Sequence, residues 1–97
     1  MSIEVNGAPI DYSALPLHMQ DAMERYMERG IEPGSFLSAV LCNDFMSAVE
    51  RADHINRERL VDYAHWLYQC APPASFGSVY KFRSWIKERR LQLQQEE

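Results

Sequence analysis

The stretch GSFLSAVLCNDFMSAVERAD, residues 34–53, decides the fold that this sequence predicts. After a turn through Pro33 and Gly34, with Ser35 as the expected N-cap, it is apolar on nearly every side for two turns. It then becomes sharply two-faced. A helix has this composition when other elements surround one of its ends on all sides, while at its other end only one face is buried and the opposite face lies in solvent. We therefore predict that residues 36–52 form the central helix of a small all-α domain.

Winding residues 36–52 at 100° per residue gives this helix two faces. The apolar face consists of Leu37, Leu41, Phe45, Ala48, Val49 and Ala52. The opposite face consists of Asn43, Asp44, Ser47, Glu50 and Arg51. Phe36 and Val40 lie on that otherwise polar side. Either a neighbouring segment such as the N-terminal arm covers them, or they form the apolar end of a binding surface.

Start and stop signals predict three further helices. Pro16 and Gly30 bound the first, and Ser78 caps the last. Between them, Asn56 is the expected N-cap of a helix that the prolines after Ala71 end. The predicted architecture is all-α: a compact bundle of four helices at about 16–29, 36–52, 57–71 and 79–92.

The two ends of the chain carry weaker patterns. In the N-terminal arm, residues 1–12, the segment 3–10 alternates apolar and polar around Asn6-Gly7, a dipeptide that favours a tight hairpin turn. This N-terminal arm is either a small hairpin or an ordered but irregular segment. Residues 93–97 are expected to be a frayed tail. With no internal repeat and no linker, residues 1–97 are predicted to form a single helical domain.

The charge is divided unevenly along the chain. The net charge is −4; residues 1–62 carry eleven acids and five bases (−6), and residues 63–97 carry five bases and three acids (+2). All five of the latter bases lie in residues 81–90. This asymmetry fits a protein partner, or a second copy in a homodimer, better than a nucleic-acid backbone, which is usually bound by a strongly basic domain.

Targeting signals are not evident. No stretch approaches the roughly 18 apolar residues of a membrane span. The N-terminus also lacks the basic start and apolar block of a signal peptide. We therefore expect a cytoplasmic protein with no membrane partner, in which Cys42 and Cys70 are free thiols within helical apolar patterns.

Catalytic and metal-binding patterns are weak. Glu58, Asp62 and His65 share one helix face at i, i+4 and i+7, but no fourth ligand is apparent, and a solvated helix face explains them. Reactive cysteines need an exposed, electropositive setting, whereas Cys42 lies in the most apolar turn of the chain. Nucleophile elbows, phosphate-binding glycine loops and Cys-x-x-Cys pairs are missing. We predict no enzymatic activity, no cofactor and no metal.

The remaining class is a protein-interaction module. Trp66 and Trp85 are of a residue type enriched in interface hot spots, and each is either part of the core or an exposed anchor. The candidate partner-binding residues are Phe36, Val40, Asn43, Asp44, Arg51, Trp66 and Trp85. The alternative is a nucleic-acid-associated protein that follows phosphates with one edge of its last helix. The candidate residues for that alternative are Arg83, Lys87 and Arg90.

Several runs of the chain also resemble a known group of proteins. They are residues 15–19 (LPLHM), 29–45 (RGIEPGSFLSAVLCNDF), 51–53 (RAD), 56–57 (NR), 77–78 (GS) and 85–86 (WI). Over about residues 15–87 the chain resembles short uncharacterised proteins of tailed phages and prophages. The resemblance carries no biochemical activity. It implies a small accessory phage protein in the bacterial host cytoplasm that binds and modulates a host or phage protein, such as a defence or host-takeover factor.

In that context the polar residues of the central stretch gain interest. Asn43, Asp44, Arg51 and Asp53 either brace the exposed face and the corner after it or take part in recognition. Bracing is the role that we expect first, because Asp44 and Arg51 lie at i and i+7 and Asp53 immediately precedes the corner.

Overall fold

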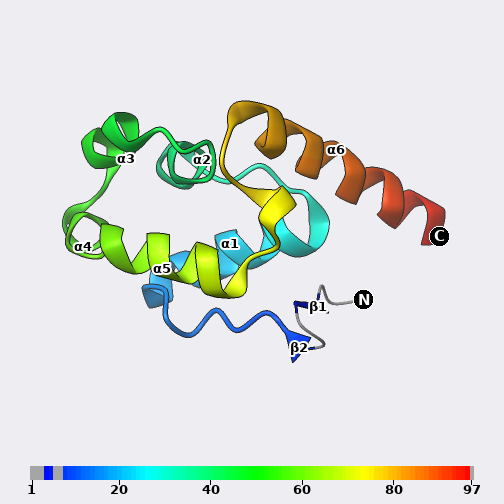
Figure 1. Ribbon diagram of the computed structural model, residues 1–97, viewed down its shortest axis with the longest axis horizontal. Helices are drawn as coiled ribbons and strands as arrows, with labels where there is room; N and C mark the ends of the chain where they lie inside the picture. The colour runs from blue at the N-terminus through cyan, green and yellow to red at the C-terminus, as the bar shows by residue number, and fades with distance from the viewer. Residues whose placement is uncertain (1–3, 6–7, 97) are drawn as a thin grey trace.

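The computed structural model describes residues 4–5 and 8–96, and this part of the chain is mostly helical, as predicted (Figure 1). The elements in chain order are β1 Glu4–Val5, β2 Ala8–Pro9, α1 Leu17–Arg29, α2 Ser35–Leu41, α3 Phe45–Arg51, α4 His54–Glu58, α5 Leu60–Cys70, the 3₁₀ turn η1 Pro73–Ser75, and α6 Val79–Glu96. The all-α class is confirmed. The described residues form six α-helices rather than a bundle of four, because two of the predicted helices are broken.

The first break divides the predicted helix 36–52 at Cys42-Asn43-Asp44 into α2 and α3. Asn43 has a φ of 61°, in the left-handed region that asparagine tolerates better than most residues. One consequence is that Phe45, predicted on the buried face, is 66% exposed. At the start of α2, Gly34 rather than Ser35 stands at the N-cap position.

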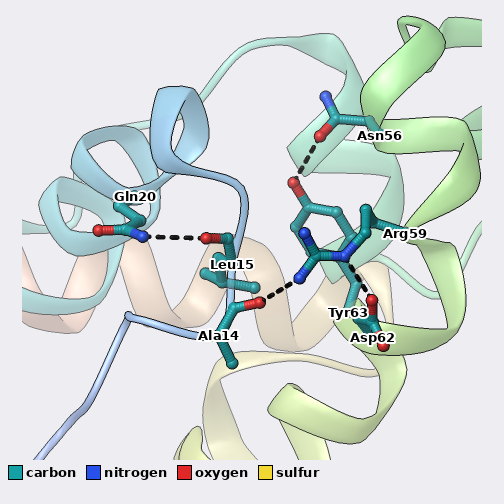
Figure 2. A network of polar contacts seen from close by, with 7 residues as sticks. All are labelled: Ala14, Leu15, Gln20, Asn56, Arg59, Asp62 and Tyr63. Atoms are coloured by element: carbon teal, nitrogen blue, oxygen red, sulfur yellow. Dashed lines mark hydrogen bonds and ion pairs between the residues drawn. The ribbon is translucent and has the colours of Figure 1, made fainter.

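The second break lies at Arg59, within the predicted helix 57–71. Helix α4 begins at His54, before the predicted start, and ends at Glu58, and α5 follows. Asp53 rather than Asn56 caps the first of these helices, because its carboxylate accepts the Asn56 N–H at 2.8 Å. Asn56 is instead buried, and its side-chain oxygen accepts the Tyr63 hydroxyl at 2.7 Å (Figure 2).

The N-terminal arm forms a hairpin at its start and then lies against α5. Strands β1 and β2 pair antiparallel, with Val5 opposite Ala8; the predicted Asn6-Gly7 turn lies outside the described residues. The following segment is held by its backbone carbonyls: Asp11 accepts the Trp66 indole N–H at 2.7 Å, and Ala14 accepts an Arg59 guanidinium N–H at 2.7 Å. Figure 2 shows Arg59 reaching Ala14. The arm therefore covers Trp66.

The first predicted helix is confirmed as α1, which begins after Pro16 and ends at Gly30. Gly30 is required there for two reasons: its φ is +67°, and a Cβ at this position would lie 2.7 Å from the Ile86 carbonyl oxygen of α6. On the side of α1 that faces the core, Met23, Tyr26 and Met27 are fully buried.

Helix α6 joins this core and binds the end of α1. Ser78 caps it as predicted, accepting the Lys81 N–H at 3.1 Å. Its buried face includes Phe82, which stacks on Tyr26 with ring centroids 5.4 Å apart. The helix continues to Glu96, beyond the predicted end at residue 92. In Figure 1 its C-terminal half projects beyond the other helices.

Three side chains of α6 donate to carbonyls at the C-terminal end of α1. The Trp85 indole binds Tyr26 (3.2 Å), the Arg89 guanidinium binds Glu28 (2.8 Å), and Arg90 binds Gly30 (3.3 Å). The last carbonyls of a helix have no partner within the helix and carry partial negative charge. Arg89 is consequently buried although it carries a charge.

Candidate functional site

The site begins at the junction between α2 and α3. The Asp44 N–H donates to the Ala39 carbonyl (2.9 Å) and the Asn43 N–H to the Val40 carbonyl (3.1 Å). With Asn43 in the left-handed conformation, this is the Schellman pattern of helix termination. The chain therefore ends α2 and turns within three residues, and both polar side chains at the turn are left exposed.

Asp44 also begins α3, because its carboxylate accepts the Ser47 N–H at 3.2 Å. Hydrogen bonds from Ser47, and more weakly the charge of Arg51, hold the pKa of Asp44 below its ordinary value. The side chain is therefore an exposed carboxylate that stays ionised over the physiological pH range.

Helix α5 lies opposite this junction. Six of its residues face the α2–α3 segment: Leu60, Val61, Tyr63, Ala64, Leu67 and Tyr68. They recur at i, i+1, i+3, i+4, i+7 and i+8, which is one broad face of a helix. Tyr63 and Leu67 are buried, whereas Val61 and Tyr68 are 69% and 83% exposed.

Between these two walls is an open apolar groove with a volume of about 260 Å³. Its α2–α3 wall consists of Ala39, Val40, Asn43, Asp44, Phe45 and Ala48. The loop before α6 contributes Phe76 and Gly77: the Phe76 ring meets Tyr68 edge-on at 5.7 Å, and the Gly77 N–H donates to the Leu41 carbonyl at 2.8 Å. The groove thus has a buried apolar floor and a rim of exposed aromatic and aliphatic side chains.

Of the predicted partner-binding residues, Val40, Asn43 and Asp44 line this groove together. Arg51 is exposed on α3 but does not line it. The structure therefore brings together the residues at the second half of α2 and its C-terminal turn, whereas the rest of the predicted surface is placed elsewhere.

Three predicted partner-binding residues, whose burial the sequence leaves open, belong to the core. Phe36 is 6% exposed and packs edge-on against Tyr63, with ring centroids 5.4 Å apart. Trp66 (2%) and Trp85 (9%) have their indole N–H groups bonded to backbone carbonyls. Buried tryptophans usually find such a partner, and here the arm and α1 supply it.

The exposed rim residues Phe45, Val61 and Tyr68, and the half-buried Phe76 beside them, were not predicted as binding residues. Phe45 follows a helix break that the periodicity does not indicate. Val61 and Tyr68 do give a signal, because each directly follows a leucine, Leu60 or Leu67, and the two lie seven residues apart on one side of the helix. Residues at the edge of an apolar helix face contribute either to the core or to a surface, and only the packing of the whole molecule decides which.

The basic edge of α6 is partly engaged within the molecule. Arg83 forms an ion pair with Glu32 at 2.5 Å, and Arg90 donates to the Gly30 carbonyl. Lys87 is exposed. Of the three residues named for phosphate binding, Arg83 and Arg90 therefore already bond to other residues of this chain.

The structure offers little for nucleophilic or metal chemistry among the described residues. Burial raises the pKa of both thiols, Cys42 and Cys70, and so disfavours their reactive thiolate forms. Within residues 4–5 and 8–96, no three His, Cys, Asp or Glu side chains are grouped so that they could hold a metal ion. Of the predicted Glu58, Asp62 and His65 face, Asp62 forms an ion pair with Arg59.

Comparisons with known proteins do not assign the chain to a family. No family model matches the chain, and no curated protein or solved structure shows significant similarity to it. Among the described helices, none has the length and apolar character needed to cross a membrane.

Proposed function

We propose that this protein is a non-enzymatic protein-interaction module whose binding site is the groove between α2–α3 and α5. The observation that carries the proposal is the rim: Phe45, Val61 and Tyr68 are each at least 66% exposed around an apolar floor. Exposed apolar patches of this kind on small proteins are typical of interaction sites. Aromatic side chains beside a concave apolar surface are also the usual anchors of a protein interface.

The proposed setting is a phage or prophage protein in the bacterial cytoplasm, acting on a host or phage protein. Its basis is the resemblance of residues 15–87 to short phage proteins. The groove supplies a physical means for such a role, since a small protein that carries no chemistry can modulate a larger one only by binding to it.

Affinity capture with paired variants tests this proposal. Val61→Glu places a charge on the groove rim, and Leu17→Glu makes the same change on α1 at a residue that is 83% exposed and does not line the groove. Both variants should fold, because both side chains are largely in solvent. We expect proteins captured by the wild type to be retained by Leu17→Glu and lost from Val61→Glu. A set of captured proteins that is the same for all three would refute the groove as the site.

The alternative, a nucleic-acid-associated protein using α6, is supported by the five bases in residues 81–90. Of Arg83, Lys87 and Arg90, the first and last already bond to other residues of the chain. The Lys87 side chain is exposed, and among the described residues it has no bond that would compete with a phosphate. Salt titration separates the two functions, since phosphate binding weakens steeply as salt rises. If no complex with duplex DNA forms at low salt, the alternative is excluded.

A further inference from the structure

The length of the groove indicates what kind of segment can occupy it. Its α5 wall extends from Leu60 to Tyr68, eight residue steps apart. At 1.5 Å per residue this is about 12 Å, or slightly more than two helical turns. A partner helix laid along α5 would therefore present side chains at i, i+4 and i+7 within that length.

The volume of the groove limits how such a segment binds. A helix with its side chains is roughly 10–12 Å across, so two turns of it occupy far more than 260 Å³. The backbone of the partner must therefore lie on the rim, with only its apolar side chains inserted. The exposed rings of Phe45 and Tyr68 would flank the inserted residues, as in other helix-in-groove complexes.

The charge of the groove indicates a basic partner. Among the residues that line it, Asp44 is the only one with a charge. Its carboxylate accepts a single backbone N–H, from Ser47. A lysine or arginine beside the apolar anchors of the partner would meet this carboxylate at the α2–α3 junction.

The same observations disfavour a second copy of the chain as the occupant. A symmetric pairing of two grooves would add a second Asp44 to the interface, and the lining offers no cation to offset it. Apart from the rim itself, no described helix has two exposed large apolar side chains at spacings of three, four or seven. The exposed pair Tyr80 and Leu91 on α6, for example, is eleven residues apart.

We propose that the groove binds an amphipathic helix of a partner protein, which inserts two or three apolar side chains at i, i+4 and i+7 and places a lysine or arginine against Asp44. This inference rests on the proposed function and specifies its partner. The apolar anchors supply most of the affinity, and the charge selects among helices that share the same apolar spacing.

Three peptides of about 16 residues, long enough to form a helix on binding, test the proposal. The first has leucines at i, i+4 and i+7, flanked at both ends by lysine. The second has the same composition with its leucines scattered around the helix, and the third has glutamates in place of the flanking lysines. Titration into ¹⁵N-labelled full-length protein measures both the affinity and the residues that respond.

The expected result is that the first peptide shifts the amide signals of residues 39–48 and 60–68 and binds at least tenfold more tightly than the second. Asp44→Asn keeps an N-cap side chain but removes the charge. This substitution should lower the affinity for the lysine peptide by roughly two- to fivefold, the size expected of an exposed ion pair, and should not lower the affinity for the glutamate peptide.

Three results would overturn this inference. One is equal binding of the ordered and scattered peptides. Another is a set of shifts at the groove that appears on concentrating the protein alone, which would make a second copy the occupant. The third is that none of the three peptides binds while capture of a partner still depends on Val61, in which case the groove remains the site and the helical occupant is wrong. If capture does not depend on Val61 either, the proposed function itself fails.

Discussion

At the scale of single residues, the junction between α2 and α3 depends on one backbone conformation and one carboxylate. Asn43 adopts a left-handed φ of 61°, and Asp44 caps the helix that follows. Both residue types are common in these roles, because their short polar side chains bond to nearby backbone. The pair also fits the polar face of an unbroken helix, which is why periodicity alone predicts one helix over residues 36–52.

The cap gives a prediction about acid stability. The pKa of Asp44 is lowered in the folded protein, so its contribution to the free energy of unfolding is complete above the ordinary value of 3.8 and is lost as the pH falls through the folded-state pKa. Asp44→Ala should therefore be less stable than the wild type at neutral pH, and the difference should narrow below about pH 4. Urea unfolding of both proteins across this pH range measures the difference in their free energies of unfolding.

Asp44→Asn is the control for this experiment, because asparagine caps a helix without titrating. Its stability relative to Asp44→Ala should not change with pH. A gap between the wild type and Asp44→Ala that stays constant down to pH 3 would show that the ionised carboxylate does not stabilise α3.

At the scale of elements, the end of a helix was predictable where a residue that typically starts, caps or ends helices stands at that position. Pro16 and Gly30 bound α1, and Ser78 caps α6, as the sequence indicates. The internal breaks at Asn43 and Arg59 carry no such signal, since nothing nearby in sequence forbids a continuous helix there. The groove was predictable only in part, because the exposure of Phe45 follows from the first of these breaks.

The contact between α6 and α1 gives a second prediction. Arg89 is 7% exposed, and its guanidinium donates two N–H groups to the Glu28 carbonyl. Hydrogen bonds that involve a charged group contribute about 1.5–3 kcal/mol. Arg89→Ala should lower the free energy of unfolding by about that amount, as measured in urea. Lys87→Ala, an exposed neighbour on the same helix, should change it by less than about 0.5 kcal/mol.

The outcome that would contradict this reading is equal stability of the two variants. The guanidinium of Arg89 would then be no better paired in the folded protein than in water. The C-terminal end of α1 would then depend on Trp85, Arg90 and the close packing of Gly30.

At the scale of the whole molecule, the candidate site lies against the core and shares with it the buried residues Tyr63 and Leu67. Trp66 and Trp85, the residues that look most like interface anchors in the sequence, belong to the core. Their indole N–H groups bond to the arm and to α1. The groove is built from less conspicuous residues, such as Val61 and Tyr68 on the flank of α5. Its composition is apolar and its one charge is acidic, so it favours a partner that is amphipathic and basic.

Site-specific photo-crosslinking in cells that contain the partner tests the central claim most directly. A photoreactive residue is placed either at Tyr68 on the groove rim or at Leu17 on α1, two positions with the same exposure of 83%. If the groove is the binding site, the protein labelled at position 68 should crosslink to one partner, and the protein labelled at position 17 should not. Equal crosslinking from both positions, or crosslinking from position 17 alone, would contradict it.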